Sequence, residues 1–220
     1  MRLKAMAKIN LGLDVLGKRE DGYHEVRMIM QTIRMYDILD IRKTRRPGIV
    51  LTTNLPFIPT DQRNLVYKAA QMLMEEFDVE EGLSIKLRKF IPVAAGMAGG
   101  SSDAAAAFVG VNRMFHLGLT EEQLMERAVK VGADVPYCIM RGTALAEGIG
   151  EKLTRLPEVP KCYVLIGKPG INVSTKTAYE NLNLEGIGKH PDIDGLIGAI
   201  RNNDLYAMAS RMENVFEPGI

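Results

Sequence analysis

The sequence has too few cysteines and too short apolar runs for several classes of protein. Its two cysteines, Cys138 and Cys162, form no disulfide framework, and neither has a His or Cys neighbour at zinc-ligand spacing. No apolar run approaches the roughly 18 residues that span a bilayer. Lys4 and Lys8 interrupt the N-terminal segment too early for a secretory signal. We therefore expect a cytoplasmic protein with reduced cysteines, no membrane partner and no metal site of its own.

An excess of charge of one sign is also missing. Lys and Arg total 28 and Asp and Glu total 27, which leaves a net charge of +1. This balance provides no basic surplus to attract nucleic acid or an anionic membrane surface, so we expect neither as a partner. Hydrophobic residues make up 46% and charged residues 25%, as in ordinary globular proteins. Disorder and fibrous repeats are therefore excluded for the chain as a whole.

Hydrophobic periodicity predicts a mixture of strands and helices. Apolar residues alternate from Leu3 to Val15, which is typical of a strand, and a second β-rich run at 26–41 follows the turn at Asp21-Gly22. The further predicted elements are a helix from Thr60 or Asp61 to about 77, a strand at 83–87, helices at 101–116 and from Thr120, short strands at 137–140 and 143–147, a strand at 163–167, and helices at 174–182, 192–201 and 203–216.

Two prolines, Pro157 and Pro160, predict a connection between domains. A length of 220 residues suits one large domain, or one domain with a smaller companion. We therefore expect a first domain at 1–158 and a second at 159–220.

A glycine-rich segment carries the strongest local signal. Its glycines let the backbone approach a ligand closely and adopt positive φ. The Ala-rich helix that follows offers unpaired N–H groups and the positive end of its dipole to an anion, most naturally a phosphate. Neither the Walker A nor the Rossmann spacing matches, and a serine-capped helix after a flexible turn is the alternative. The segment consists of Pro92, Val93, Ala94, Ala95, Gly96, Met97, Ala98, Gly99, Gly100, Ser101 and Ser102.

Other polar residues have both a structural and a functional interpretation. Lys8 and Asn10 lie on the polar face of the first strand, where a lysine is usually solvated. Asp134 stands in an otherwise apolar stretch, either as a turn former or as a working carboxylate. Tyr23 and His24 could stack on a nucleotide base, or be an exposed loop aromatic and a solvent-facing histidine. The residues alone leave these alternatives open.

Together these segments resemble the GHMP-type small-molecule kinases. The match is collinear from the first residues to about Thr175, so it covers most of the chain. It is most similar to the branch that acts on a cytidine-diphosphate-linked methylerythritol. The resemblance rests on Ala7-Lys8-Ile9-Asn10-Leu11, Asp21-Gly22-Tyr23-His24, Pro92 to Ala106, Gly132-Ala133-Asp134-Val135-Pro136, and Gly142 to Glu151.

The resemblance implies a fold and a reaction. The fold is α/β (α+β), with an N-terminal domain like domain 2 of ribosomal protein S5 and a ferredoxin-like C-terminal domain. In the reaction, ATP with Mg²⁺ phosphorylates the 2-hydroxyl of the cytidyl substrate, on the non-mevalonate route to isoprenoid precursors. By position, Lys8 and Asp134 match the catalytic pair and residues 92–102 match the ATP-phosphate loop. The positions that match substrate-binding residues are Asn10, Tyr23, His24 and, more loosely, Thr175.

One departure from the family pattern concerns the C-terminal part. Members of the family run further and carry a late Gly-Ser-Gly-Pro-type loop that nothing in this chain matches. We therefore expect an incomplete ferredoxin-like domain. The alternatives are another GHMP kinase, acting on homoserine or mevalonate, or a non-catalytic nucleotide-binding fragment. The Tyr23-His24 turn favours the cytidyl substrate, because the other two substrates have no base to stack.

Overall fold

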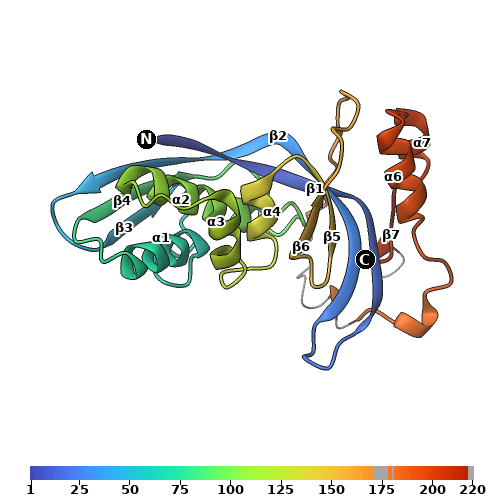
Figure 1. Ribbon diagram of the computed structural model, residues 1–220, viewed down its shortest axis with the longest axis horizontal. Helices are drawn as coiled ribbons and strands as arrows, with labels where there is room; N and C mark the ends of the chain where they lie inside the picture. The colour runs from blue at the N-terminus through green and yellow to red at the C-terminus, as the bar shows by residue number, and fades with distance from the viewer. Residues whose placement is uncertain (171–177, 180, 218–220) are drawn as a thin grey trace. The chain divides into compact units, whose positions relative to one another are not determined.

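The computed structural model describes residues 1–170, 178–179 and 181–217, and these form two compact units. Two long strands, β1 (Arg2–Lys18) and β2 (His24–Thr44), contribute residues to both units (Figure 1). The two strands confirm the two β-rich runs of the sequence analysis and are hydrogen-bonded neighbours in the sheet. The domain boundary near residue 158 stays a prediction. Unit 1 comprises residues 1–8, 33–93 and 97–140, and unit 2 comprises residues 9–32, 94–96 and 141–220.

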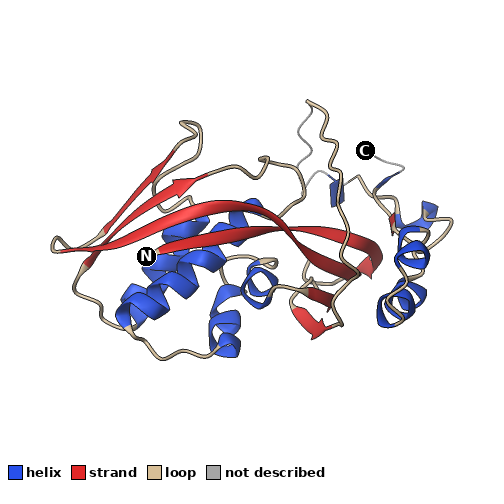
Figure 2. Ribbon diagram, turned by 90° about the horizontal axis from the view of Figure 1, so that it is seen from above, coloured by secondary structure: helices blue, strands red, loops and turns tan. Residues whose placement is uncertain are grey.

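Unit 1 is a sheet with helices on one side, as Figure 2 shows. The strand order is β3–β4–β2–β1, in which β2 pairs antiparallel with β4 (Gly82–Arg88) and β4 pairs parallel with β3 (Ile49–Thr53). Alternating apolar residues of these strands face the helices and form the core. The helices are α1 (Leu65–Glu76), α2 (Gly99–Phe115), α3 (Glu121–Ala128) and α4 (Val135–Met140). The largest fully buried side chains of this unit include Leu39, Ile41, Leu73, Leu83, Ile85, Leu87, Phe108 and Tyr137.

Helix starts in unit 1 follow local capping chemistry, though one cap differs from the prediction. The capping box predicted at Thr120 is present, since its hydroxyl accepts from the N–H of Gln123 and the Gln123 side chain accepts from Thr120. Helix α1, however, is capped by Asn64 rather than by Thr60 or Asp61, so it begins about one turn later than predicted. Asp61 instead binds Arg63 through backbone and side chain.

Residues 135–140 form helix α4, so the strand predicted at 137–140 is wrong. All six residues of this helix are buried, and a short apolar run without alternation is compatible with either structure. A proline in the first turn of a helix loses no intrahelical hydrogen bond, which removes the objection to Pro136. The first helical hydrogen bond runs from the Cys138 N–H to the Asp134 carbonyl, at 3.1 Å.

Among its described residues, unit 2 contains the ends of the two long strands, a small hairpin and short helices. Strand β5 (Thr143–Glu147) pairs antiparallel with β2 and with β6 (Lys152–Arg155), and β7 (Glu213–Asn214) pairs parallel with β1. Helix α6 (Ile193–Arg201) confirms the prediction for 192–201. It packs so closely on β1 that a Cβ at Gly12 would lie 2.9 Å from Ile193 Cδ1. Further elements of the described residues are α7 (Leu205–Ala209) and the short η1 (Leu184–Gly186).

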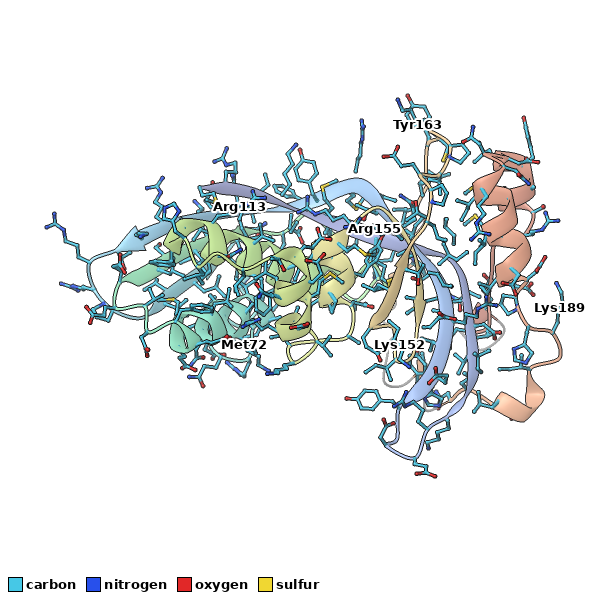
Figure 3. The ribbon with its side chains drawn as sticks, in the orientation of Figure 1. Met72, Arg113, Lys152, Arg155, Tyr163 and Lys189 are labelled. Atoms are coloured by element: carbon cyan, nitrogen blue, oxygen red, sulfur yellow. The ribbon has the colours of Figure 1, made fainter. Side chains whose placement is uncertain are left out.

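Two further expectations for unit 2 differ from the structure. Residues 163–167 are not a strand. The side chain of Tyr163 (Figure 3) is fully exposed, and so is that of Leu165. A short apolar run predicts a strand here, but a strand also needs a hydrogen-bonded neighbour, and no described residue pairs with this segment. The helix predicted at 203–216 ends at Ala209, before β7. Most of the helix predicted at 174–182 lies outside the described residues, and the ferredoxin-like domain stays a prediction.

Candidate active site

Lys8 and Asp134 lie together in unit 1. The Lys8 Nζ is 3.9 Å from the Asp134 Oδ2, and the Lys8 side chain is 6% exposed whereas that of Asp134 is 33% exposed. Lys8 therefore lies on the polar face of β1, as predicted, but it is buried rather than solvated. A buried ammonium is stabilised by a nearby carboxylate, and Asp134 supplies one. This pairing brings together one residue from the first strand and one from the start of α4.

The backbone around the pair explains how the two side chains are held. The Lys8 N–H donates to the Met97 carbonyl at 3.2 Å, so the glycine-rich segment contacts β1 at Lys8 itself. The Met97 side chain is buried, which anchors that contact. On the other side, Asp134 immediately precedes α4, and its carbonyl accepts from Cys138. Two backbone anchors, each adjacent to a site residue, thus orient Lys8 and Asp134.

The glycine-rich segment contains three left-handed residues, two of which are alanines. Ala94, Gly96 and Ala98 have φ values of 53°, 66° and 52°. A left-handed alanine costs about 1–2 kcal/mol, so the segment holds strain that the surrounding structure must sustain. Ala98 also precedes α2 directly, and no side chain of the described residues caps that helix at this position. The first N–H groups of α2 are therefore left for another acceptor.

Helix α2 begins at Gly99, two residues before its predicted start. Ser101 and Ser102 consequently lie inside the first turn and do not cap the helix. The Ser102 side chain is buried, and its hydroxyl donates to the Met6 carbonyl at 2.5 Å. Ser102 therefore joins α2 to β1.

The substrate-side candidates of the sequence analysis belong to unit 2. His24 is partly buried, and its ring centroid is 5.0 Å from that of Tyr179. Burial, with a smaller contribution from the positive charge of Lys18, lowers the pKa of His24 below its usual value. Tyr23 is 59% exposed at the hairpin tip. Asn10 is half-buried on β1, and Thr175 lies outside the described residues.

Sequence reasoning missed a buried ionic cluster beside the glycine-rich segment. It consists of Asp37, Lys89 and Asp103, all nearly inaccessible to solvent. A signal existed for Asp37, because it stands within the apolar, β-rich run at 26–41 that predicts β2. Lys89 and Asp103 have no comparable signal, since a lysine after a strand and an acid near a helix start are ordinary surface residues.

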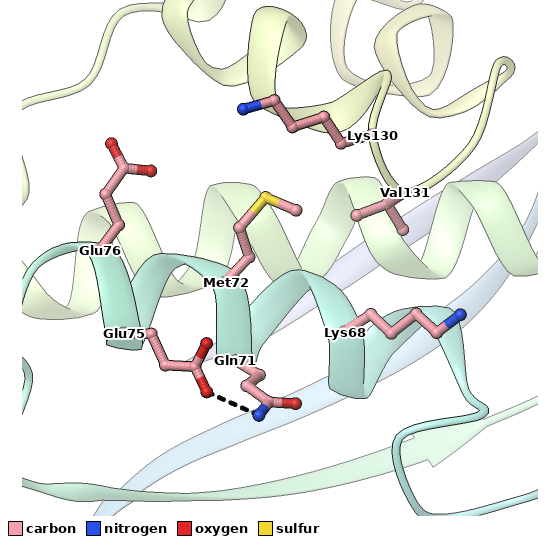
Figure 4. A pocket seen from close by; sticks show the side chains of 7 residues that line it. All are labelled: Lys68, Gln71, Met72, Glu75, Glu76, Lys130 and Val131. Atoms are coloured by element: carbon pink, nitrogen blue, oxygen red, sulfur yellow. Dashed lines mark hydrogen bonds between the residues drawn. The ribbon is translucent and has the colours of Figure 1, made fainter.

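A separate hollow of about 600 Å³ lies between α1 and the residues that follow α3 (Figure 4). It contains none of the predicted site residues. Its walls carry both charges, and the Gln71 amide donates to Glu75 one turn further along α1. Its lining residues are Lys68, Gln71, Met72, Glu75, Glu76, Lys130 and Val131.

The described part of the chain has neither a cluster of metal ligands nor a helix suited to a membrane. No group of three or more His, Cys, Asp or Glu side chains there could hold a metal ion. Among the same residues, no helix combines the length and the apolar character needed to cross a bilayer.

Comparison with known proteins decides the family. Residues 64–142 match the family described as GHMP kinases N terminal domain. Over 217 residues the chain is 56% identical to the 4-diphosphocytidyl-2-C-methyl-D-erythritol kinase of Lachnospira eligens. The matched region covers 99% of this chain and 75% of that protein. This chain belongs to the 4-diphosphocytidyl-2-C-methyl-D-erythritol kinase family. The enzyme of the same name from Lachnoclostridium phytofermentans is 57% identical over 215 residues, or 98% of this chain and 74% of that protein.

Solved structures give the same fold. A crystal structure of 4-(cytidine 5'-diphospho)-2C-methyl-D-erythritol kinase matches with a TM-score of 0.80 and 29% identity, over 99% of this chain and 76% of that one. Homoserine kinase from Cytophaga hutchinsonii matches with a TM-score of 0.75 and 19% identity, over 99% of this chain and 73% of that one, which shows a shared fold. The predicted GHMP kinase fold is confirmed.

Proposed function

We propose that this chain transfers the γ-phosphoryl group of ATP to the 2-hydroxyl of 4-diphosphocytidyl-2-C-methyl-D-erythritol. The observation that carries the proposal is the Lys8–Asp134 pair, 3.9 Å apart, in contact with the glycine-rich segment through Met97. Relatives named for this kinase at more than 50% identity support the substrate class. The cytoplasmic location stays a prediction from the sequence.

In this proposal Asp134 accepts or orients the proton of the substrate hydroxyl. Its carboxylate is one-third exposed, so a substrate can reach it, and the Lys8 ammonium stabilises its negative charge. Lys8 also offsets negative charge on the transferring phosphoryl group. Catalysis of phosphoryl transfer depends mainly on positioning and electrostatic stabilisation. The buried Lys8 ammonium supplies the positive charge, and the hydrogen bond from the Lys8 N–H to the Met97 carbonyl helps to hold the residue in place.

Residues 92–102 bind the phosphates of ATP in this proposal. The first N–H groups of α2 have no side-chain cap at Ala98, and the dipole of this 17-residue helix favours an anion at its start. Magnesium would arrive bound to the phosphates, since it keeps several water ligands and needs few protein groups. The described residues offer it no acidic cluster, so we assign no protein ligand and no step to it.

Asn10, Tyr23, His24 and Thr175 bind the cytidyl substrate in this proposal. The exposed Tyr23 ring and the partly buried His24 imidazole support an aromatic contact with the cytosine. The lowered pKa of His24 supports a neutral imidazole at neutral pH, which can donate one hydrogen bond and accept another.

A coupled assay of ADP release tests the proposed function. The chain is incubated with ATP and, in separate reactions, the cytidyl substrate, homoserine or mevalonate. We expect turnover with the cytidyl substrate, and its loss in Asp134→Ala. Preferred turnover of homoserine or mevalonate would overturn the substrate assignment. ATP binding without turnover of any of the three would overturn the enzymatic assignment and leave a nucleotide-binding protein.

A further inference from the structure

Three charged side chains meet in the interior of unit 1. Asp37 comes from β2, Lys89 follows β4, and Asp103 lies near the start of α2. Their side chains are 0%, 5% and 3% exposed. The Lys89 Nζ donates to the Asp37 Oδ2, and it donates to the Asp103 Oδ2 at 2.7 Å. A single ammonium thus links two carboxylates from two different elements.

The cluster holds the residues that lead into the glycine-rich segment. The Asp37 Oδ1 accepts from the N–H groups of Phe90 and Ile91 at 2.5 and 2.8 Å. These are the last two residues before Pro92. Asn54 constrains the same backbone further, because its side chain accepts from the Lys89 N–H and donates to the Lys89 carbonyl. The backbone of 89–91 is therefore fixed just where the segment begins.

The same cluster holds the helix into which the segment leads. Asp103 lies on α2, one turn after its start. Gly99, the first residue of α2, packs directly on the cluster, because a Cβ there would lie 3.1 Å from the Lys89 Nζ and 3.2 Å from the Ile91 Cγ2. Lys89 therefore bridges the entry and the exit of the segment at 92–98.

We infer that Asp37, Lys89 and Asp103 are positioning residues of the ATP-phosphate loop. Their ionic link fixes both ends of a strained segment and so sets where the first N–H groups of α2 point. Donors that are fixed before a ligand arrives stabilise its charge without reorganisation. The inference rests on the proposed function, since it assumes that residues 92–102 receive phosphate.

The charge of the cluster supports a role in positioning rather than in stability alone. Burying two carboxylates and one ammonium is expensive, and apolar side chains of similar size often stabilise a core as well or better. Burial, with the neighbouring charge of Asp37, raises the pKa of Asp103 well above its usual value although Lys89 opposes the shift. A proton on Asp103 leaves a neutral cluster. The Asp103 Oδ1 is buried and has no hydrogen-bond partner among the described residues.

The test compares Asp103→Ala with a matched control. This substitution cuts the link to α2 but leaves the Asp37–Lys89 ion pair balanced, and alanine suits the Ala-rich helix. The control is Glu76→Ala, which removes an acid from the Arg127 ion pair between α1 and α3 in the same unit, without touching the loop. Asp103→Asn keeps an oxygen that can accept from Lys89 and serves as the conservative variant.

We measure KM for ATP, KM for the cytidyl substrate, and the ATP-induced rise in Tm. In Asp103→Ala we expect KM for ATP to rise between about tenfold and a hundredfold, as for a displaced binding group. KM for the cytidyl substrate and the far-ultraviolet dichroism should stay unchanged. Asp103→Asn should restore ATP affinity, and Glu76→Ala should change KM for ATP by less than about twofold, as a distant site does.

Each outcome of these measurements either supports or overturns the positioning role of the cluster. A lower Tm in Asp103→Ala with unchanged KM for ATP would show a purely structural role and overturn the inference. If Asp103→Ala does not fold, Lys89→Met is measured instead, and failure of both variants to fold would also overturn it. Absence of turnover in the unmodified chain refutes the proposed function instead, and the ATP-induced rise in Tm still separates Asp103→Ala from its controls.

Discussion

Replacing Lys8 by methionine removes the ammonium of the candidate active site and keeps most of the buried stem. In the native chain the Nζ lies 3.9 Å from the Asp134 Oδ2, with the lysine side chain 6% and the aspartate side chain 33% exposed. Lys8→Met should therefore remove the positive charge without leaving a large cavity.

The distance gives the strength of the Lys8 field, and kcat falls by the share of that field that acts on charge formed only in the transition state. Two unit charges 3.9 Å apart interact by about 1 kcal/mol in bulk water and about 4 kcal/mol at an effective dielectric constant of about 20. One partner is buried and the other partly solvated, so the field of Lys8 lies between these limits. Because each 1.36 kcal/mol changes a rate about tenfold, kcat should fall between roughly fivefold and a thousandfold. The free energy of unfolding should change by less than about 1 kcal/mol, since the partly exposed Asp134 keeps much of its hydration.

The assay is ADP release at saturating ATP and cytidyl substrate, with thermal unfolding followed by circular dichroism. Lys4→Met is the matched control, because Lys4 lies on the same strand and its ammonium lies 4.2 Å from the centre of the Tyr36 ring, away from Asp134. It should retain kcat. Undiminished turnover in Lys8→Met would refute the electrostatic role of Lys8, and failure of this variant to fold would make Lys8 a structural residue.

Three further changes test other parts of the site. Ser102→Ala removes the donor to the Met6 carbonyl and should lower the free energy of unfolding by about 0.5–1.5 kcal/mol in denaturant titrations. A neutral result would argue against that hydrogen bond. Asp103→Asn removes a carboxyl group whose pKa is raised in the folded state. Above pH 3.8, the folded native chain therefore binds more protons than the unfolded chain. The free energy of unfolding of the native chain should consequently fall, relative to that of the variant, as the pH rises from there. A pH-independent difference between the two unfolding curves would contradict this sign. His24 keeps its neutral form below its usual pKa of 6.5, so KM for the cytidyl substrate should begin to rise only below pH 6.5 as the pH is lowered. His24→Phe should lack that rise, and a rise centred above pH 6.5 in the native chain would be inconsistent with a buried imidazole.

Local patterns in the sequence predict much of unit 1. Alternation identifies β1, β2 and β4, and the Thr120 capping box identifies the start of α3, because these signals depend on near neighbours in the chain. The same patterns fail where the environment decides. Residues 135–140 are apolar throughout and become a helix, whereas the apolar run at 163–166 has no pairing strand among the described residues.

The candidate site divides in the same way. Lys8, Asp134 and the glycine-rich segment are recognisable from residue types and motif spacing, and relatives at more than 50% identity confirm the family to which those motifs point. Three other features cannot be recognised from the sequence, because each depends on a contact between distant parts of the chain. They are the burial of Lys8, the hydrogen bond from the Ser102 hydroxyl to Met6, and the start of α2 at Gly99.

By itself, the sequence determined which residues could perform the chemistry and which short segments could be strands, helices or turns. Only the tertiary structure decided which of them meet. It pairs Lys8 with Asp134, and it buries Asp37, Lys89 and Asp103 together beside the loop. The physical reason is that periodicity and capping report on neighbours along the chain, whereas desolvation and ion pairing depend on what the whole fold places within a few ångströms.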